Sequence, residues 1–160
     1  MVMVWAAMSE NHLIGPFFVD GRITSTRYLQ LLEDEFLPAL RMRRLIRLCH
    51  FQQDGAPAHT AMNTREYLNK HFPNRWIGKF GPTPWPPRSP DLTSSDNALW
   101  GIVKHFVRQE KPTSLDELKT AVIAGFQELD GEMLRKIHAR TFRRLQLCVE
   151  LGGLQVDPYD

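Results

Sequence analysis

The chain has 160 residues, 42% of them hydrophobic and 24% charged, and a formal net charge of +2. This composition is typical of a globular protein with its own core, so it excludes a disordered chain, and the net charge alone does not indicate a nucleic-acid binder. The longest apolar runs, such as 2–8, are too short to span a bilayer, and no signal peptide is evident. Cys49 and Cys148 lie among apolar residues, which predicts buried thiols in a reducing compartment.

The N-terminal quarter predicts a hairpin followed by a helix. Apolar runs at 2–8 and 13–19 are separated by turn-like residues and closed by an Asp-Gly pair, as in two antiparallel strands. Thr24 or Ser25 can cap a helix whose apolar positions recur at helical spacing. Pro38 is expected to end or kink that helix.

The middle of the chain predicts two strands, a helix and an irregular segment. Residues 44–52 are expected to form a third strand, with Asp54 at its carboxyl end. Residues 63–72 predict a helix, and "RWIGKF" after it a short strand. The segment 81–92 is so rich in proline that it can be neither a helix nor a central strand, so an ordered extended loop is expected.

The last third predicts helices only. Spacings of three and four residues from Asp96 to Val107 predict a helix with Asp96 in its first turn, on the core-facing side. The sequence "SLDE" at 114–117 is a capping box, and a final helix is expected from about 131 to 151, followed by a loose tail. The pattern predicts an α/β fold on a mixed sheet, with a helical C-terminal third.

Basic residues cluster twice. The first cluster comprises Arg41, Arg43, Arg44 and Arg47, and it is equally consistent with a solvated surface and with phosphate contacts. The second cluster comprises Arg135, Lys136, Arg140, Arg143 and Arg144. A solvated helix face is the preferred interpretation, with phosphate contacts as the alternative.

Two acids are placed where they can carry chemistry. Asp54 ends a strand and Asp96 begins a helix, and carboxylates in such positions can converge. Converging carboxylates repel unless a cation lies between them, and Mg²⁺ or Mn²⁺ prefers such hard oxygen ligands. The simpler alternative is an Asp-Gly turn at Asp54 and an ordinary N-terminal helix acid at Asp96.

Two ordered motifs, "FQQDGAPAHTA" and "WPPRSPDLTSSDNALWGIVK", resemble the catalytic core of mariner-type transposases. The opening segment through "LPAL" and "FPNRWIGKF" is similar to the same family, so the resemblance covers nearly the whole chain. It implies an RNase H-like mixed sheet flanked by helices, within a DDE-superfamily endonuclease of DNA transposition and integration. Three acids in that family hold two divalent ions, Mg²⁺ or Mn²⁺, for cleavage and strand transfer of DNA.

The resemblance assigns roles residue by residue. It implies that Asp54 is the second acid of the triad and Asp96 the third, both of them catalytic and metal-binding. His59 lies in the first motif, where either a hydrogen bond that braces the turn or a role near DNA or metal is expected. Arg88 is the basic residue expected closest to a phosphate, with a solvated arginine as the equal alternative. Asp91 is expected to brace the loop.

In members of that family, the first acid and the first central strand lie N-terminal to the segment that corresponds to Val2 of this chain. The expectation is therefore a catalytic domain at 1–150 that is truncated at its N-terminus, weak or inactive, with a tail at 151–160. The alternative is a non-catalytic DNA- or protein-binding module derived from a transposase. DNA is the expected partner, homodimerisation is a further expectation, and neither a membrane nor a small-molecule substrate is expected. The family implies a nuclear location.

Overall fold

The computed structural model of the protein describes residues 2–87 and 89–156. These form two compact units, one of residues 2–5 and 17–87 and the other of residues 6–16 and 89–156. The first part of the chain contains β1 (Val2–Met8), β2 (Leu13–Asp20), α1 (Ser25–Leu31), η1 (Leu32–Phe36), α2 (Leu37–Met42), β3 (Phe51–Gln52), α3 (Pro57–Thr60), α4 (Met62–His71), β4 (Trp76–Gly78) and β5 (Thr83–Pro84). The second contains η2 (Pro90–Leu92), η3 (Ser95–Leu99), α5 (Trp100–Glu110), α6 (Leu115–Gln127) and α7 (Gly131–Glu150).

The predicted N-terminal hairpin is confirmed. Strands β1 and β2 form a two-stranded sheet, and the Ser9 amide donates to the His12 carbonyl at 2.8 Å to close the turn between them. A connection this short joins antiparallel neighbours only, because parallel strands need a long crossover. Gly21, at φ 76°, follows β2 as the Asp-Gly turn signal predicts.

The helix after the hairpin begins as predicted but does not end at Pro38. The Thr24 hydroxyl caps α1 by accepting from the Arg27 amide at 3.3 Å. The Leu37 amide donates to the Leu32 carbonyl, so η1 is a π-helical turn, and the chain continues in α2 to Met42. Proline lacks an N–H and clashes with the carbonyl four residues back in a regular α-helix. A π-helical turn is wider than an α-helical turn. Here it lies directly before Pro38, and the helix continues beyond it.

The first unit contains a parallel sheet in the order β3-β4-β5, with Phe51 beside Trp76 and Ile77 beside Thr83. Strand β3 has two residues, so the prediction of a strand over 44–52 is wrong for most of its length. The guanidinium of Arg75 donates to the carbonyls of Ile46 and Cys49 at 3.0 and 2.8 Å. These two carbonyls therefore belong to a loop and accept from a side chain, and they do not form hydrogen bonds between strands. Strand β5, from the proline-rich segment, is an edge strand.

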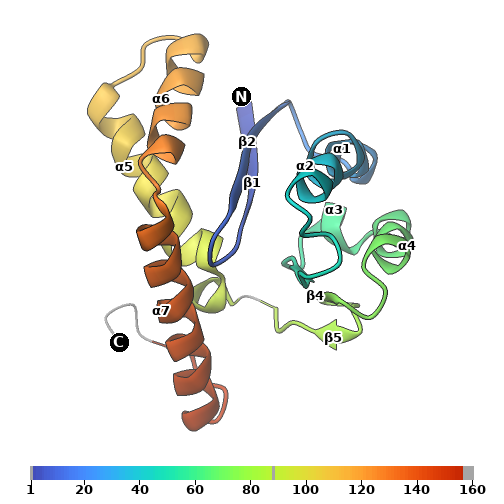
Figure 1. Ribbon diagram of the computed structural model, residues 1–160. Helices are drawn as coiled ribbons and strands as arrows, with labels where there is room; N and C mark the ends of the chain where they lie inside the picture. Colours follow the sequence, from blue (N-terminus) through green and yellow to red (C-terminus); the bar gives the residue numbers. More distant parts are fainter. Residues whose placement is uncertain (1, 88, 157–160) are drawn as a thin grey trace. The chain divides into compact units, whose positions relative to one another are not determined.

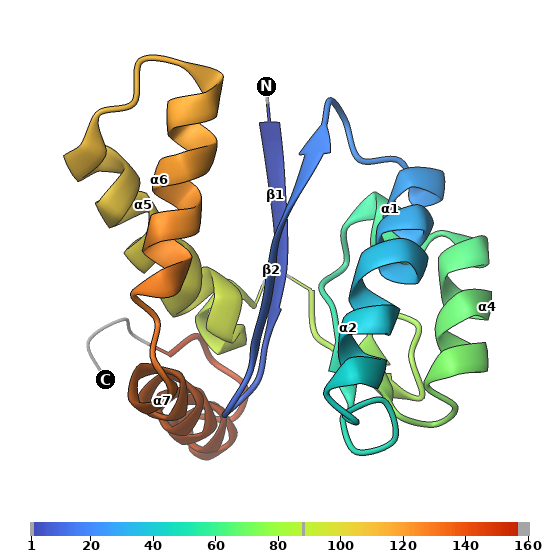
Figure 2. The ribbon, with the colours of Figure 1, turned by 45° about the horizontal axis from the view of Figure 1, so that its top comes forward.

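Aromatic rings build the core of the first unit. Trp5 contacts Phe36, Phe36 contacts Phe51, and Phe51 contacts Phe72, with centroid distances of 5.1, 5.3 and 5.4 Å. This row of rings joins the hairpin, the helix η1, strand β3 and the end of α4. Figure 2 shows α1, α2 and α4 as neighbouring helices, and Leu68 of α4 is fully buried. Burial of rings of this size is a main source of folding free energy.

The second unit is mostly helical. Helices α5 and α6 lie side by side in Figures 1 and 2, and Gly125 allows α6 to approach Val103 and Phe106 of α5 closely. Ser114 caps α6 by accepting from the Glu117 amide, as the capping box predicts. The Glu117 carboxylate accepts from the Thr113 amide at 2.7 Å, one residue before the cap. No helix in the described part of the chain is long and apolar enough to cross a membrane.

Arg144 corrects the interpretation of α7 as a solvated basic face. Only 3% of Arg144 is exposed, whereas the other four basic residues of that cluster are exposed. Its guanidinium donates to the carbonyls of Asp91 and Val156 at 2.8 and 3.1 Å. The Asp91 carboxylate accepts from the Val156 amide at 3.2 Å, which confirms the bracing role predicted for Asp91. Because Val156 is fully buried, the chain is not loose at this point.

Candidate functional site

Asp54 lies just beyond the carboxyl end of β3, in the turn that leads into α3. Its side chain is 56% exposed. Its Oδ1 atom accepts from the Ala56 amide at 3.0 Å and is 2.5 Å from Nδ1 of His59. Neither contact uses Oδ2. The predicted bracing hydrogen bond of His59 is therefore present, and it is made to Asp54 itself.

These contacts keep Asp54 ionised. The hydrogen bond from His59 lowers the pKa of Asp54, and the Ala56 amide lowers it further, against a smaller opposing effect of burial. A hydrogen bond to the charged form of a carboxyl group favours that form. Asp54 is therefore an anionic, largely exposed oxygen donor with one oxygen outside the local hydrogen bonds.

A buried network holds the turn that carries Asp54. The Tyr28 hydroxyl donates to Oε1 of Gln53 at 2.9 Å, and Nε2 of Gln53 donates to the His59 carbonyl at 2.8 Å. The rings of Tyr28 and His59 lie 4.5 Å apart. Burial and the charge of Asp54 raise the pKa of Tyr28, so its hydroxyl stays a neutral donor. Neither Tyr28 nor Gln53 was predicted as part of the site, although the alternation after buried Phe51 points Gln53 inward.

Asp96 lies in the first turn of its helix, as predicted, but its side chain is exposed, so the predicted core-facing orientation is wrong. The first turn, η3, is a π-helical turn, which shifts the phase relative to a regular helix. Leu99 and Val103 consequently occupy the buried face. Ser94, two residues before Asp96, contacts the Thr141 hydroxyl at 2.9 Å, which ties this segment to α7.

The predicted DNA contacts are only partly described by the structure. Arg41, Arg43 and Arg44 are all exposed at the end of α2, and Arg43 donates to the Ala39 carbonyl at 3.2 Å. Arg44 has a φ of 57°, in the left-handed region. Arg88 lies outside the described residues. The exposed arginines are thus available to an anionic partner, but their role stays a prediction.

The donor chemistry suits a hard divalent ion, although the structure describes the two acids in separate units. Asp54 belongs to the first unit and Asp96 to the second. Within residues 2–87 and 89–156, no group of three or more His, Cys, Asp or Glu side chains could hold a metal ion. Each of the two acids is nevertheless an exposed carboxylate, the ligand that Mg²⁺ and Mn²⁺ prefer.

Replacing His59 by alanine is expected to raise the pKa of Asp54 toward that of an ordinary aspartate. A pKa lowered by folding stabilises the folded chain above about pH 4, and this stabilisation is lost as the pH falls through the lowered pKa. Since Asp54 is more than half exposed, the contribution is below about 1 kcal/mol. Carboxyl ¹³C NMR titration measures the pKa directly. His59→Asn, whose amide nitrogen can replace Nδ1, should keep the pKa low, and an equal rise in both variants would contradict the assignment.

Two curated relatives match the chain in sequence. The Tc3 transposase of Caenorhabditis elegans is 32% identical over 140 residues, which is 85% of this chain and 39% of that protein. The Tcb2 transposase of Caenorhabditis briggsae is 26% identical over 152 residues, 95% of this chain and 52% of that protein. The chain therefore spans about half or less of these relatives. No protein-family model matches it.

Solved structures match in fold. The catalytic domain of Mos1 transposase, in a structure with Raltegravir and Mn, has a TM-score of 0.80 and 23% identity over 98% of this chain and 76% of that chain. A Mos1 paired-end complex with the left transposon end has a TM-score of 0.79 and 24% identity, over 98% of this chain and 44% of that chain. These similarities confirm the predicted α/β fold of the RNase H-like type. The chain is therefore similar in sequence to Tc transposases and in fold to the mariner transposase catalytic domain, and both comparisons support a mariner/Tc transposase catalytic domain.

Proposed function

We propose that this chain is a transposase catalytic core that acts on DNA phosphodiester bonds with the help of divalent metal ions. The observation that carries the proposal is the state of Asp54, an exposed, ionised carboxylate at the carboxyl end of a parallel strand. Ligand sites of open α/β sheets lie at this end of the strands. Asp96, exposed in the first turn of its helix, is proposed as the second acid.

Asp54 and Asp96 are the residues proposed to hold Mg²⁺ or Mn²⁺. Mos1 catalytic-domain structures are known with Mn and with Mg, which supports this choice of ions. Bound divalent ions activate an attacking oxygen and neutralise charge at a phosphodiester. Residues 1–150 are proposed as the catalytic core, and the segment that follows is joined to it at Val156 through Arg144 and Asp91.

Plasmid nicking tests this function. The purified chain is incubated with supercoiled plasmid and Mn²⁺ or Mg²⁺, and Mn²⁺ binding is measured in parallel by electron paramagnetic resonance. Asp54→Ala and Asp96→Ala should each reduce Mn²⁺ binding, and they should abolish whatever nicking the chain performs. Asp116→Ala is the matched control, because Asp116 is also an exposed first-turn acid. Mn²⁺ binding and nicking that are unchanged in both variants would refute the metal-site assignment.

The exposed arginines at the end of α2 favour a second candidate, a non-catalytic DNA- or protein-binding module. Arg41, Arg43, Arg44 and Arg47 present four exposed guanidinium groups on one short segment. This candidate predicts salt-sensitive DNA binding that survives the double change Asp54→Ala, Asp96→Ala and weakens when the four arginines become alanine. Loss of binding in the double variant would exclude it.

DNA is the proposed partner, supported by a Mos1 structure of similar fold that is a paired-end complex with a transposon end. A nuclear location is proposed as well. Homodimerisation is proposed as well, and light scattering on the purified chain measures it.

A further inference from the structure

Beyond the carboxyl ends of β3 and β4, a lysine side chain lies close to the turn that carries Asp54. The Gln53 amide donates to the Ile77 carbonyl at 3.0 Å, so the parallel register of β3 and β4 continues past β3. A Cβ atom added at Gly55 would lie 3.9 Å from Cδ of Lys79. The Lys79 side chain therefore lies beside Gly55, the residue that follows the candidate catalytic acid.

An exposed aromatic ring lies beside this lysine and close to two cations. Phe80 is 52% exposed. The Arg65 guanidinium lies 4.9 Å from the centroid of its ring, and Nζ of Lys79 lies 5.3 Å from it. Nε of Arg65 is buried without a hydrogen-bond partner in the part of the chain that the structure describes. Phe80 is thus a large apolar ring that is exposed to water next to positive charge. Such a site suits a ligand that has a flat face and an anionic backbone.

We propose that Phe80, Lys79 and Arg65 form a binding site for single-stranded DNA beside Asp54. Phe80 stacks against an unpaired base, and the two cations contact the flanking phosphates. A duplex hides the faces of its bases, so a ring that stacks on a base without unstacking a helix requires an unpaired strand. The single-strand site extends the proposed function, because it would place a DNA strand next to Asp54, the acid proposed to act on DNA. This inference rests on the proposed function.

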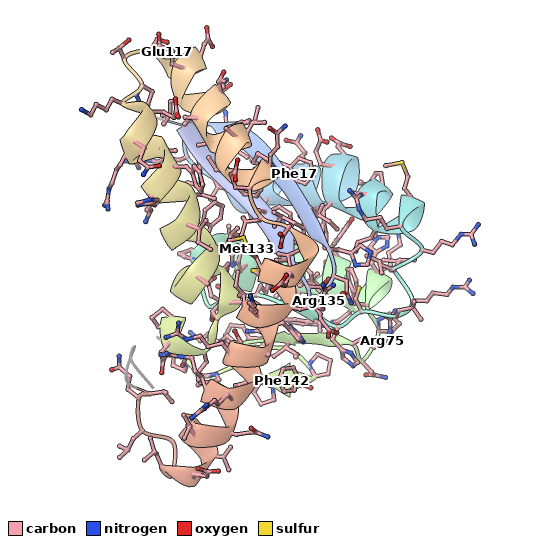
Figure 3. All side chains as sticks on the ribbon, turned by 60° about the vertical axis from the view of Figure 1, so that its left-hand side comes forward. Phe17, Arg75, Glu117, Met133, Arg135 and Phe142 are labelled. Carbon is pink, nitrogen blue, oxygen red and sulfur yellow. The ribbon has the colours of Figure 1, made fainter. Side chains whose placement is uncertain are left out.

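Fluorescence anisotropy with two probes tests the stacking. One probe is a labelled oligo-dT, and the other is an oligonucleotide of the same length with abasic sites in place of the bases. Phe80→Ala should weaken oligo-dT binding about fivefold or more and leave binding of the abasic probe unchanged, because only the base–ring contact is lost. Phe80→Trp should retain the affinity for oligo-dT. Phe142→Ala is the matched control, since Phe142 is a 56% exposed aromatic on α7 (Figure 3) and should change neither affinity.

The salt dependence tests the two cations. Each phosphate contact to a single strand contributes about 0.7 to the slope of log affinity against log salt concentration. Lys79→Ala and Arg65→Ala should each reduce this slope by about that amount. Lys70→Ala is the control, since Lys70 is also exposed but lies elsewhere on α4.

The outcomes separate this site from the proposed function. If Phe80→Ala weakens both probes equally, or matches Phe142→Ala, the stacking site is refuted, while nicking and metal binding still decide the catalytic proposal. Absence of oligo-dT binding at low salt also refutes the site. If Phe80→Ala selectively weakens oligo-dT binding and the chain binds no Mn²⁺, the site stands and the catalytic proposal fails.

Discussion

Replacing Arg144 by alanine is expected to lower the free energy of unfolding by about 3 kcal/mol. The buried guanidinium donates to the carbonyls of Asp91 and Val156, and both acceptors would be left without this donor. The lost side chain would also leave a cavity, because only 3% of Arg144 is exposed. The same change should loosen the segment before Asp96, since Asp91 belongs to η2.

Urea unfolding followed by circular dichroism measures this loss. Arg143→Ala is a close control, because Arg143 is the exposed neighbour of Arg144 on α7 and its loss should cost less than about 0.5 kcal/mol. Arg144→Lys should recover part of the stability, since an ammonium group keeps the charge but lacks the planar fork of donors. Equal stability of the Arg144→Ala and Arg143→Ala proteins would show that the buried guanidinium contributes nothing.

Elements set by local signals were predictable from the sequence. The Thr24 cap needs only the residues that follow it, and the hairpin turn after β1 needs only four residues. Pro73 marks the end of α4 in the same local way. In each case the hydrogen bond or steric clash that decides the structure joins residues within about one turn of each other.

Elements decided by distant partners were not predictable. The Arg75 guanidinium donates to the carbonyls of Ile46 and Cys49, so an apolar run that resembles a strand forms a loop. Arg144 is buried because the carbonyls of Asp91 and Val156 accept its hydrogen bonds. No local sequence pattern around Arg144 indicates either of these acceptors. The exposure of Asp96 depends on a π-helical turn, which periodicity at 3.6 residues does not reveal.

For the candidate site, the sequence predicts two acids, whose metal-binding role stays a prediction, but it does not predict the residues that support them. The motif around Asp54 identified the carboxylate and named His59 as a brace. The network behind them was missed, because Tyr28 comes from a helix 25 residues earlier in the chain than Gln53. Sequence patterns identify candidate catalytic residues by their type and spacing. The residues that orient them depend on tertiary packing, which the patterns do not describe.

Replacing Gln53 by leucine is expected to lower the free energy of unfolding by about 3 kcal/mol. Gln53 is 7% exposed and links the Tyr28 hydroxyl to the His59 carbonyl, so its loss leaves a buried donor and an acceptor without their partner. The change also frees the turn that sets His59 against Asp54. The pKa of Asp54 should therefore rise in this variant, an effect that a loss of packing elsewhere in the core would not produce.

Gln52→Leu is the matched control for this network. Gln52 is the preceding residue of the same strand and is exposed, so its replacement should change stability by less than about 0.5 kcal/mol and leave the pKa of Asp54 unchanged. Tyr28→Phe removes only the hydroxyl and should cost about 1 kcal/mol. Combined with Gln53→Leu it should cost less than the sum of the two, because both changes break the same hydrogen bond. Additive losses would show that Tyr28 and Gln53 act independently, and the site would then lack the buried support on which the position of Asp54 depends.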